Sequence, residues 1–270
     1  MYVTESQAFA NVEYSWEMGF KGKGFASLGY GYIWDDFYNK NIAAISNSDV
    51  SKFQNRAAAL TFGYERFTLN NLLYPSAGSQ IKASAYIGLE DTKTTYMESN
   101  SEATYVARPK GRIEALWKNY FQIGRNFSFG TYAAGMMTLM HGNRNYLAAM
   151  ISNPEFAPMP SFKNYFNTAF RASNYLSAGV SPVWSPVSKL QIRGDFFGYF
   201  PVRNEIRKEN GNLGYDGWFR KAEFMGEISA VYNFPFASLS VYCNYLSYPA
   251  RNWNVGVSFG WLIQAPGFPH

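Results

Sequence analysis

Residues 253–263 read Trp-Asn-Val-Gly-Val-Ser-Phe-Gly-Trp-Leu-Ile, and this stretch decides the fold class. Large apolar side chains occupy every second position, while Asn, Gly and Ser occupy positions between them. A period of two places successive side chains on opposite faces of a β-strand. The stretch therefore predicts a strand with one bulky apolar face and one small, polar face.

The same alternation appears at the other end of the chain and between the two ends. Residues 8–18 place Ala, Val, Tyr, Trp and Met on one face and Asn, Glu and Ser on the other. A strand that crosses a bilayer needs about 9–11 residues, and each predicted strand reaches that length. With the two terminal strands, the following ranges give about eleven: 24–34, 56–68, 78–90, 104–119, 126–139, 165–181, 187–202, 218–233 and 236–247.

Charged residues of both signs fall on a single face of each predicted strand. A lipid-facing Arg or Lys costs about 2–4 kcal/mol at the bilayer midplane, whereas a barrel lumen accommodates charge. We therefore predict that the charged face lines a lumen. The predicted lumen-lining residues are Arg108, Lys110, Arg112, Glu114, Arg171, Arg193, Lys221, Glu223 and Glu227.

Composition excludes several classes of protein. Aromatic residues make up 19% of the 270 residues and charged residues only 16%, unlike an ordinary soluble domain. The mean hydropathy is −0.26, and no apolar stretch is long enough for a transmembrane helix. A protein with these properties can still lie in a membrane if its strands alternate outward apolar and inward polar side chains. The 24 basic and 19 acidic residues are interspersed, which disfavours nucleic acid, and the single Cys243 excludes an intramolecular disulfide framework and a Cys-rich zinc site.

Loop lengths support an antiparallel transmembrane β-barrel of the bacterial outer membrane, formed by one domain over residues 1–270. Long connections at 35–55, 91–103, 140–164 and 203–217 alternate with short ones, as external loops alternate with periplasmic turns in such barrels. The expected partners are outer-membrane lipid and lipopolysaccharide, with protein partners at either rim. The first strand would enter from the external side, so we expect at least one further strand upstream. The first residues lack a signal peptide, so we expect a mature form or a fragment.

Residues 70–79, Asn-Asn-Leu-Leu-Tyr-Pro-Ser-Ala-Gly-Ser, form the most distinctive turn sequence in the chain. Pro75 presets a turn, and Gly78 permits a positive φ where the chain reverses. With Tyr74, these residues resemble a turn of the outer-membrane assembly-factor superfamily, the BamA- and TamA-type surface antigens. The resemblance implies a sixteen-stranded barrel with about five strands upstream.

Two further comparisons bear on that resemblance. The superfamily has a Val/Ile-Arg-Gly-Phe/Tyr signature on a loop, but the nearest stretch here, Ile192-Arg-Gly-Asp-Phe, has the alternation of a barrel wall, and no POTRA-type domain is present. Residues 196–202, Phe-Phe-Gly-Tyr-Phe-Pro-Val, resemble strands of barrels fused behind patatin-like phospholipases. That resemblance implies an anchor for a catalytic domain outside this chain.

We predict no catalytic, cofactor-binding or metal-binding residues in this chain. The sequence around Ser258 matches G-x-S-x-G, but a nucleophile elbow needs a strand-to-helix turn, and this serine lies within a regular strand pattern. His141 in a predicted external loop and the terminal His270 are the only histidines, and the oxyanion loop of patatin-like enzymes is absent. Asp35 and Asp36 could bind a cation with Asp91 and Glu90 across the next loop, or simply form a solvated cap.

Two structural features are also expected. Residues 145–154 are apolar with near-helical spacing, so they could enter the lumen as a plug, bind a partner or form a short loop helix. Aromatic residues near strand ends suit the interfacial girdles of a barrel. These are Trp34, Trp117, Trp184, Trp218, Tyr248 and Trp253.

Three functions remain open from the sequence. The first is a membrane anchor or export barrel, belonging to a patatin-like phospholipase. The second is an insertase of the assembly-factor type, and the third is a passive diffusion porin. The upstream sequence would discriminate them, since a catalytic unit, POTRA-type repeats or a bare signal peptide would precede the three respectively.

Overall fold

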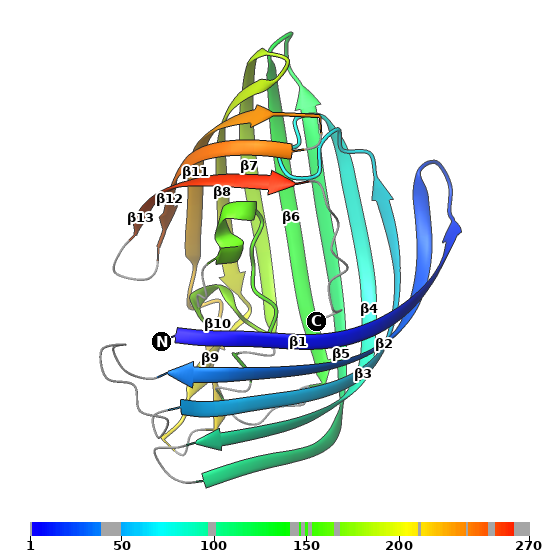
Figure 1. Cartoon of the computed structure of the whole chain (residues 1–270), viewed down its shortest axis with the longest axis vertical. Helices are drawn as coiled ribbons and strands as arrows, with labels where there is room; N and C mark the ends of the chain where they lie inside the picture. Colours follow the sequence, from blue (N-terminus) through cyan, green and yellow to red (C-terminus); the bar gives the residue numbers. More distant parts are fainter. Residues whose placement is uncertain are drawn as a thin grey trace.

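The protein, described here by a computed structural model, is built from antiparallel β-strands (Figure 1). The structure describes residues 2–38, 50–96, 101–140, 146, 149–150, 153–164, 168–209, 212–235, 237–247 and 252–261. Within these residues eleven strands form one sheet, and β9 and β10 form a separate hairpin. In chain order the strands are β1 (Tyr2–Glu17), β2 (Gly22–Tyr38), β3 (Val50–Phe67), β4 (Gly78–Tyr96), β5 (Ser101–Gln122), β6 (Phe127–Met140), β7 (Asn174–Val187), β8 (Leu190–Pro201), β9 (Arg203–Arg207), β10 (Leu213–Trp218), β11 (Glu223–Asn233), β12 (Ala237–Leu246) and β13 (Trp253–Trp261).

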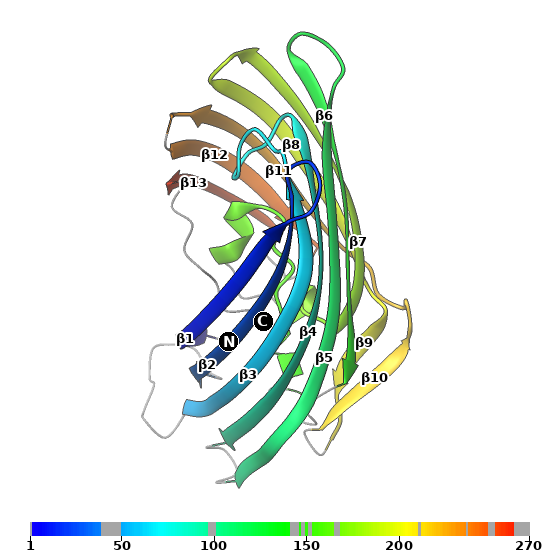
Figure 2. The same ribbon diagram turned by 90° about the vertical axis from the view of Figure 1, so that its right-hand side faces the viewer.

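The all-β antiparallel architecture predicted from the sequence is confirmed, including the eleven strands of the main sheet. Each strand pairs with the next one along the chain, except that β8 pairs with β11 across the β9–β10 hairpin. The sheet curves strongly, so that it has a convex and a concave face (Figure 2). Within the described residues no helix has the length and apolar character to cross a bilayer.

The sheet is open rather than closed. Its order begins at β1 and ends at β13, and within the described part of the chain these two strands do not pair with each other. Figure 1 shows β1 and β13 on either side of the open concave space. A closed barrel of sixteen strands stays a prediction.

The period of two in the sequence corresponds to the two faces of the sheet. On β13, Val255 is 78% exposed and Val257 68% exposed, while Ser258 is half-buried. On β11, Ile228 is 61% exposed on the convex face, whereas the neighbouring Glu227 is fully buried on the concave face. The convex face is therefore apolar, and the concave face carries the charges.

Two of the predicted long loops are wrong. The range 91–103 belongs largely to β4 and β5, which stay paired as far as Tyr96 and Ser101, because alternating Thr residues continue the strand pattern beyond Glu90. The range 203–217 contains the β9–β10 hairpin. Trp218 consequently lies on that hairpin and not on a strand of the main sheet.

Two strand boundaries are also wrong, and they displace two predicted wall residues. Strand β7 begins at Asn174 instead of 165, so Arg171 precedes it, and strand β11 begins at Glu223, so Lys221 precedes it. Phe170, which the predicted strand 165–181 would have placed on the face opposite Arg171, is only 2% exposed. The physical reason is that the apolar side chains before Asn174 are buried on the concave side of the sheet, in a shared core with Phe197 and Tyr199.

Candidate functional site

An inner segment between β6 and β7 fills part of the concave side of the sheet (Figure 2). We define it by its described residues, 153–164 and 168–173, which include the short 3-10 helices η3 (Pro160–Asn164) and η4 (Thr168–Phe170). Ala149 and Met150, from the predicted plug 145–154, are helical and buried. Of the alternatives for residues 145–154, an inward-folded plug is closest to what the structure shows, although the inner segment continues well beyond Pro154.

The inner segment packs on an aromatic part of the concave wall. The Phe156 ring stacks on the Tyr199 ring with 5.1 Å between centroids and meets the Phe197 ring edge-on at 6.4 Å. Aromatic pairs of this kind add about 0.5–1.5 kcal/mol each beyond their buried area. The shared core consists of Phe156, Met159, Phe162, Ala169, Phe170 and Ala172 from the segment and Phe197, Tyr199, Met225 and Leu246 from the wall.

A single carboxylate on β9 binds both ends of the inner segment. Glu205 accepts a hydrogen bond from Asn153 Nδ2 at 2.9 Å and another from the backbone N–H of Ser173 at 3.0 Å, and the Ser173 hydroxyl also donates to it. Burial raises the pKa of the Glu205 carboxyl above its ordinary value. The β9–β10 hairpin, which no sequence pattern predicted, therefore holds the ends of the segment together.

Further polar contacts fix the segment along its length. Arg171 pairs with Glu155 at 3.0 Å and donates to the carbonyl of Asn153 at 3.2 Å, so the segment closes on itself. The Ser161 hydroxyl donates to the buried Glu227 of β11. The inner segment is thus attached to the hairpin through the Glu205 carboxyl and to the wall through the Glu227 carboxyl.

The concave face of β1 to β5 carries a mixed row of charges. Lys110 Nζ lies 2.9 Å from Glu90, and both side chains are almost completely buried. Glu114 accepts from Ser84 at 2.7 Å and lies 3.5 Å from Lys82 Nζ. Lys82, Ser84 and Glu114 line a polar cavity of about 400 Å³, which Pro154 of the inner segment also lines.

The turn between β3 and β4 folds inward and binds the opposite wall. Tyr74 is only 4% exposed, and its hydroxyl hydrogen-bonds with Ser240 of β12 at 2.8 Å. Arg193 of β8 donates to the carbonyl of Pro75 at 3.2 Å, and its guanidinium lies 5.6 Å from the centre of the Tyr74 ring. Asp195 holds Arg193 with two hydrogen bonds, of 2.8 and 2.9 Å. Sequence reasoning identified this turn but gave no signal for its contact with β8.

Local geometry explains why these residues form the turn. Gly78 has a φ of +92°, and a Cβ there would lie 2.2 Å from the carbonyl oxygen of Thr68, so only glycine fits. The Asn70 and Asn71 side chains accept backbone hydrogen bonds within the turn, at 2.9 to 3.1 Å. Such side-chain caps are typical of Asn in turns. The turn is therefore rigid enough to present Tyr74 to the wall.

The other predicted lumen residues occupy various positions. Arg112, Glu223 and Glu227 are buried on the concave face, and Glu114 is half-buried there. Lys221 is half-buried just before β11 and pairs with Glu223 at 2.9 Å. The backbone of Arg108 pairs with Glu90 on β4, but its side chain lies outside the described residues.

Of the residues considered for catalysis, the structure describes only the surroundings of Ser258. Ser258 lies in the middle of β13, opposite Ser240 of β12. His141 and His270 lie outside the described residues, as do Tyr248 and the side chains of Asp35 and Asp36. Within the described part of the chain no three His, Cys, Asp or Glu side chains gather as metal ligands would.

Comparisons with known proteins give a likeness to solved structures but not to any known sequence family. No family profile matches the sequence, and no curated protein does. The β domain of the Bordetella autotransporter BrkA is a solved structure of similar outline, with 11% identity and a TM-score of 0.40, over 95% of this chain and 88% of that one.

Proposed function

We propose that this chain is a membrane-embedded β-barrel domain of the bacterial outer membrane that anchors or exports a larger protein. The observation that carries the proposal is the separation of the two faces of the sheet. Large apolar side chains are exposed on the convex face, whereas charged residues and the inner segment occupy the concave side. A soluble antiparallel sheet has the opposite arrangement, with its apolar face in the core.

The extent of the apolar surface supports a lipid environment. Exposed large apolar side chains occur on strands from β1 to β13, for example Val12, Leu28, Ile87, Met137 and Val255. Soluble monomers rarely expose a continuous apolar patch of more than a few hundred Å². An outward apolar band with an inward polar face is the pattern of a transmembrane barrel.

The inner segment favours an anchor or export role over a passive porin. A porin needs a continuous aqueous path, but the segment is packed against Phe197 and Tyr199 of β8 and attached through Glu205 and Glu227. At the short-turn end, the Tyr74 turn crosses to β8 and β12.

An insertase is a second candidate, because the sheet is open. Strands β1 and β13 are the ends of the sheet order and offer unpaired backbone groups along one edge each, within the described residues. Such edges are templates for pairing with another strand. The more specific hypothesis of a patatin-like phospholipase anchor rests on the resemblance of residues 196–202 alone.

Membrane fractionation tests the proposal directly. The full-length protein, expressed in a Gram-negative host, should stay with outer membranes after carbonate extraction and should shift in gel mobility on heating. A variant that carries Arg at the outward Val257 should lose that folded, membrane-resident form. Recovery of a monomeric, detergent-free protein with native sheet content would refute the proposal.

A bilayer recording distinguishes the candidate functions. The anchor or export role predicts little steady conductance for the wild type, and an increase when the contacts to Glu205 and Glu227 are removed. High constant conductance of the wild type would favour a porin. Faster insertion of a reporter barrel into vesicles that contain the protein would favour an insertase.

A further inference from the structure

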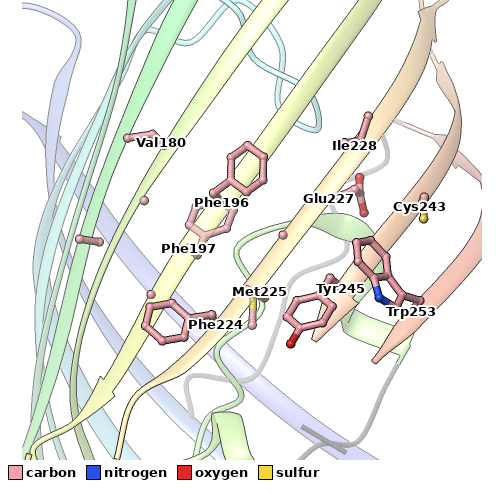
Figure 3. A pocket seen from close by; sticks show the side chains of 14 residues that line it. Val180, Phe196, Phe197, Phe224, Met225, Glu227, Ile228, Cys243, Tyr245 and Trp253 are labelled. Carbon is pink, nitrogen blue, oxygen red and sulfur yellow. The ribbon is translucent and has the colours of Figure 1, made fainter. Parts of the chain in front are cut away.

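The convex face contains a hollow centred on Gly226 of β11. In the register of the sheet, Gly226 lies between Phe196 of β8 and Tyr245 of β12, so the missing side chain leaves space between two rings. Tyr245 in turn lies opposite Trp253 of β13, with 5.1 Å between their ring centroids. Figure 3 shows these aromatic side chains around the hollow.

The neighbouring rows complete the walls of the hollow. Phe224 borders it on the side towards the β9–β10 hairpin, and Ile228 and Cys243 border it on the other side. The cavity measures about 620 Å³, which is within the range of small-ligand sites. Its lining is apolar, since Glu227, the one charged lining residue, directs its carboxylate to the concave side and is only 1% exposed.

The rim next to the hollow is basic. The β9–β10 hairpin and the residues after it join β8 to β11 directly beside Phe224. At the base of the hairpin Arg203 and Arg220 are exposed; Arg203 lies over the Tyr215 and Trp218 rings, and Arg220 pairs with Asp216 at 3.0 Å. Arg207 lies at the other end of the hairpin, opposite Leu213, and lines a separate cavity beside the inner segment.

We infer that the hollow is a binding site for an acyl chain of lipid A, with the phosphates of its headgroup at the basic rim. This inference rests on the proposed outer-membrane location. An apolar hollow without accessible charge suits a hydrocarbon chain, and Tyr245 and Trp253 at its edge suit the depth where chain meets headgroup. The neighbouring cations complement an anionic headgroup, and Arg is well suited to bind phosphate.

Filling the hollow is the sharpest test. A Cβ at Gly226 would lie 3.1 Å from the Phe196 ring and otherwise meet no close atom, so Gly226→Leu should fold and occupy the space. Ala230→Leu adds an apolar side chain to the same strand and face, outside the hollow, and is the matched control. Native mass spectrometry of the protein in detergent, titrated with lipid A, gives the affinity of each variant.

We expect Gly226→Leu to bind lipid A roughly tenfold more weakly, the loss expected when about two methylene groups lose their contacts, and Ala230→Leu to bind like the wild type. The double variant Arg203→Gln with Arg220→Gln should also bind more weakly and depend less on salt. Equal affinities of Gly226→Leu and wild type, equal losses in both leucine variants, or equally tight binding of phosphatidylglycerol would overturn the inference. Carbonate fractionation of the same wild-type protein reports separately on the proposed location.

Discussion

The contact between Arg193 and Asp195 offers a quantitative test of how the turn between β3 and β4 is held against β8. Both side chains are buried, at 4% and 3% exposure, and two hydrogen bonds of 2.8 and 2.9 Å join them. Removing one partner of a buried pair typically costs about 3–5 kcal/mol, because it leaves an uncompensated charge. We therefore expect Asp195→Asn to lower the free energy of unfolding by about that amount.

The paired replacement separates the charge from the rest of the contact. Arg193→Met combined with Asp195→Leu removes both charges, so the penalty for an unpaired charge disappears. The variant still loses the hydrogen bonds that Arg193 donates to the carbonyl of Pro75 and to the Tyr120 hydroxyl, both at 3.2 Å. Hydrogen bonds from a charged donor are worth about 1.5–3 kcal/mol each, so the double variant should be less stable than wild type. Its loss should nevertheless be smaller than the summed losses of Arg193→Met and Asp195→Leu made singly.

Urea unfolding of the protein in lipid vesicles measures these differences. The folded fraction is read from gel mobility of unheated samples, and limited proteolysis between residues 70 and 77 reports whether the turn has left the wall. We expect Asp195→Asn to unfold at lower urea and to be cleaved faster in the turn. A loss of less than about 1 kcal/mol for each single variant, or strictly additive losses, would refute a buried, coupled pair.

Three other predictions concern the wall, the turn and the hairpin. Val257→Arg should prevent assembly, because a lipid-facing Arg costs about 2–4 kcal/mol at mid-bilayer, whereas Ser258→Arg on the inward face should be tolerated. Equal heat-modifiability of the two variants would contradict the face assignment. Gly78→Ala should destabilise the fold by about 1–2 kcal/mol or more, since φ is +92° and the new Cβ would clash with a backbone carbonyl. The free energy of unfolding in urea, compared with that of the control Ala77→Gly, tests this expectation. Because burial raises the pKa of Glu205, its contribution to the free energy of unfolding is complete at low pH and is lost as the pH rises through the raised pKa. Glu205→Gln should flatten that pH dependence, and parallel stability curves for both proteins would contradict it.

The local patterns in the sequence were sufficient for the sheet. Side-chain alternation is a property of the extended backbone itself, so Val255, Val257 and Ile228 could be assigned to one face and Glu227 to the other without tertiary information. Turn chemistry is equally local, which is why Pro75 and Gly78 marked the reversal between β3 and β4. The strand ends were less certain, because Thr-rich and aromatic residues suit a strand, a hairpin or an inserted turn.

Only the tertiary structure decided which segments lie on the concave side of the sheet. Arg171 and Phe170 alternate as a strand would, yet they belong to the inner segment, since the buried surface offered by Tyr199 outweighs a local strand preference. The contact between Arg193 and Pro75 joins residues 118 positions apart, and that of Glu205 with Asn153 joins residues 52 apart. No local period encodes such pairs, because they depend on how far the whole sheet curves. The sequence alone determined the strands and their two faces, and the curvature of the sheet decided what those faces enclose.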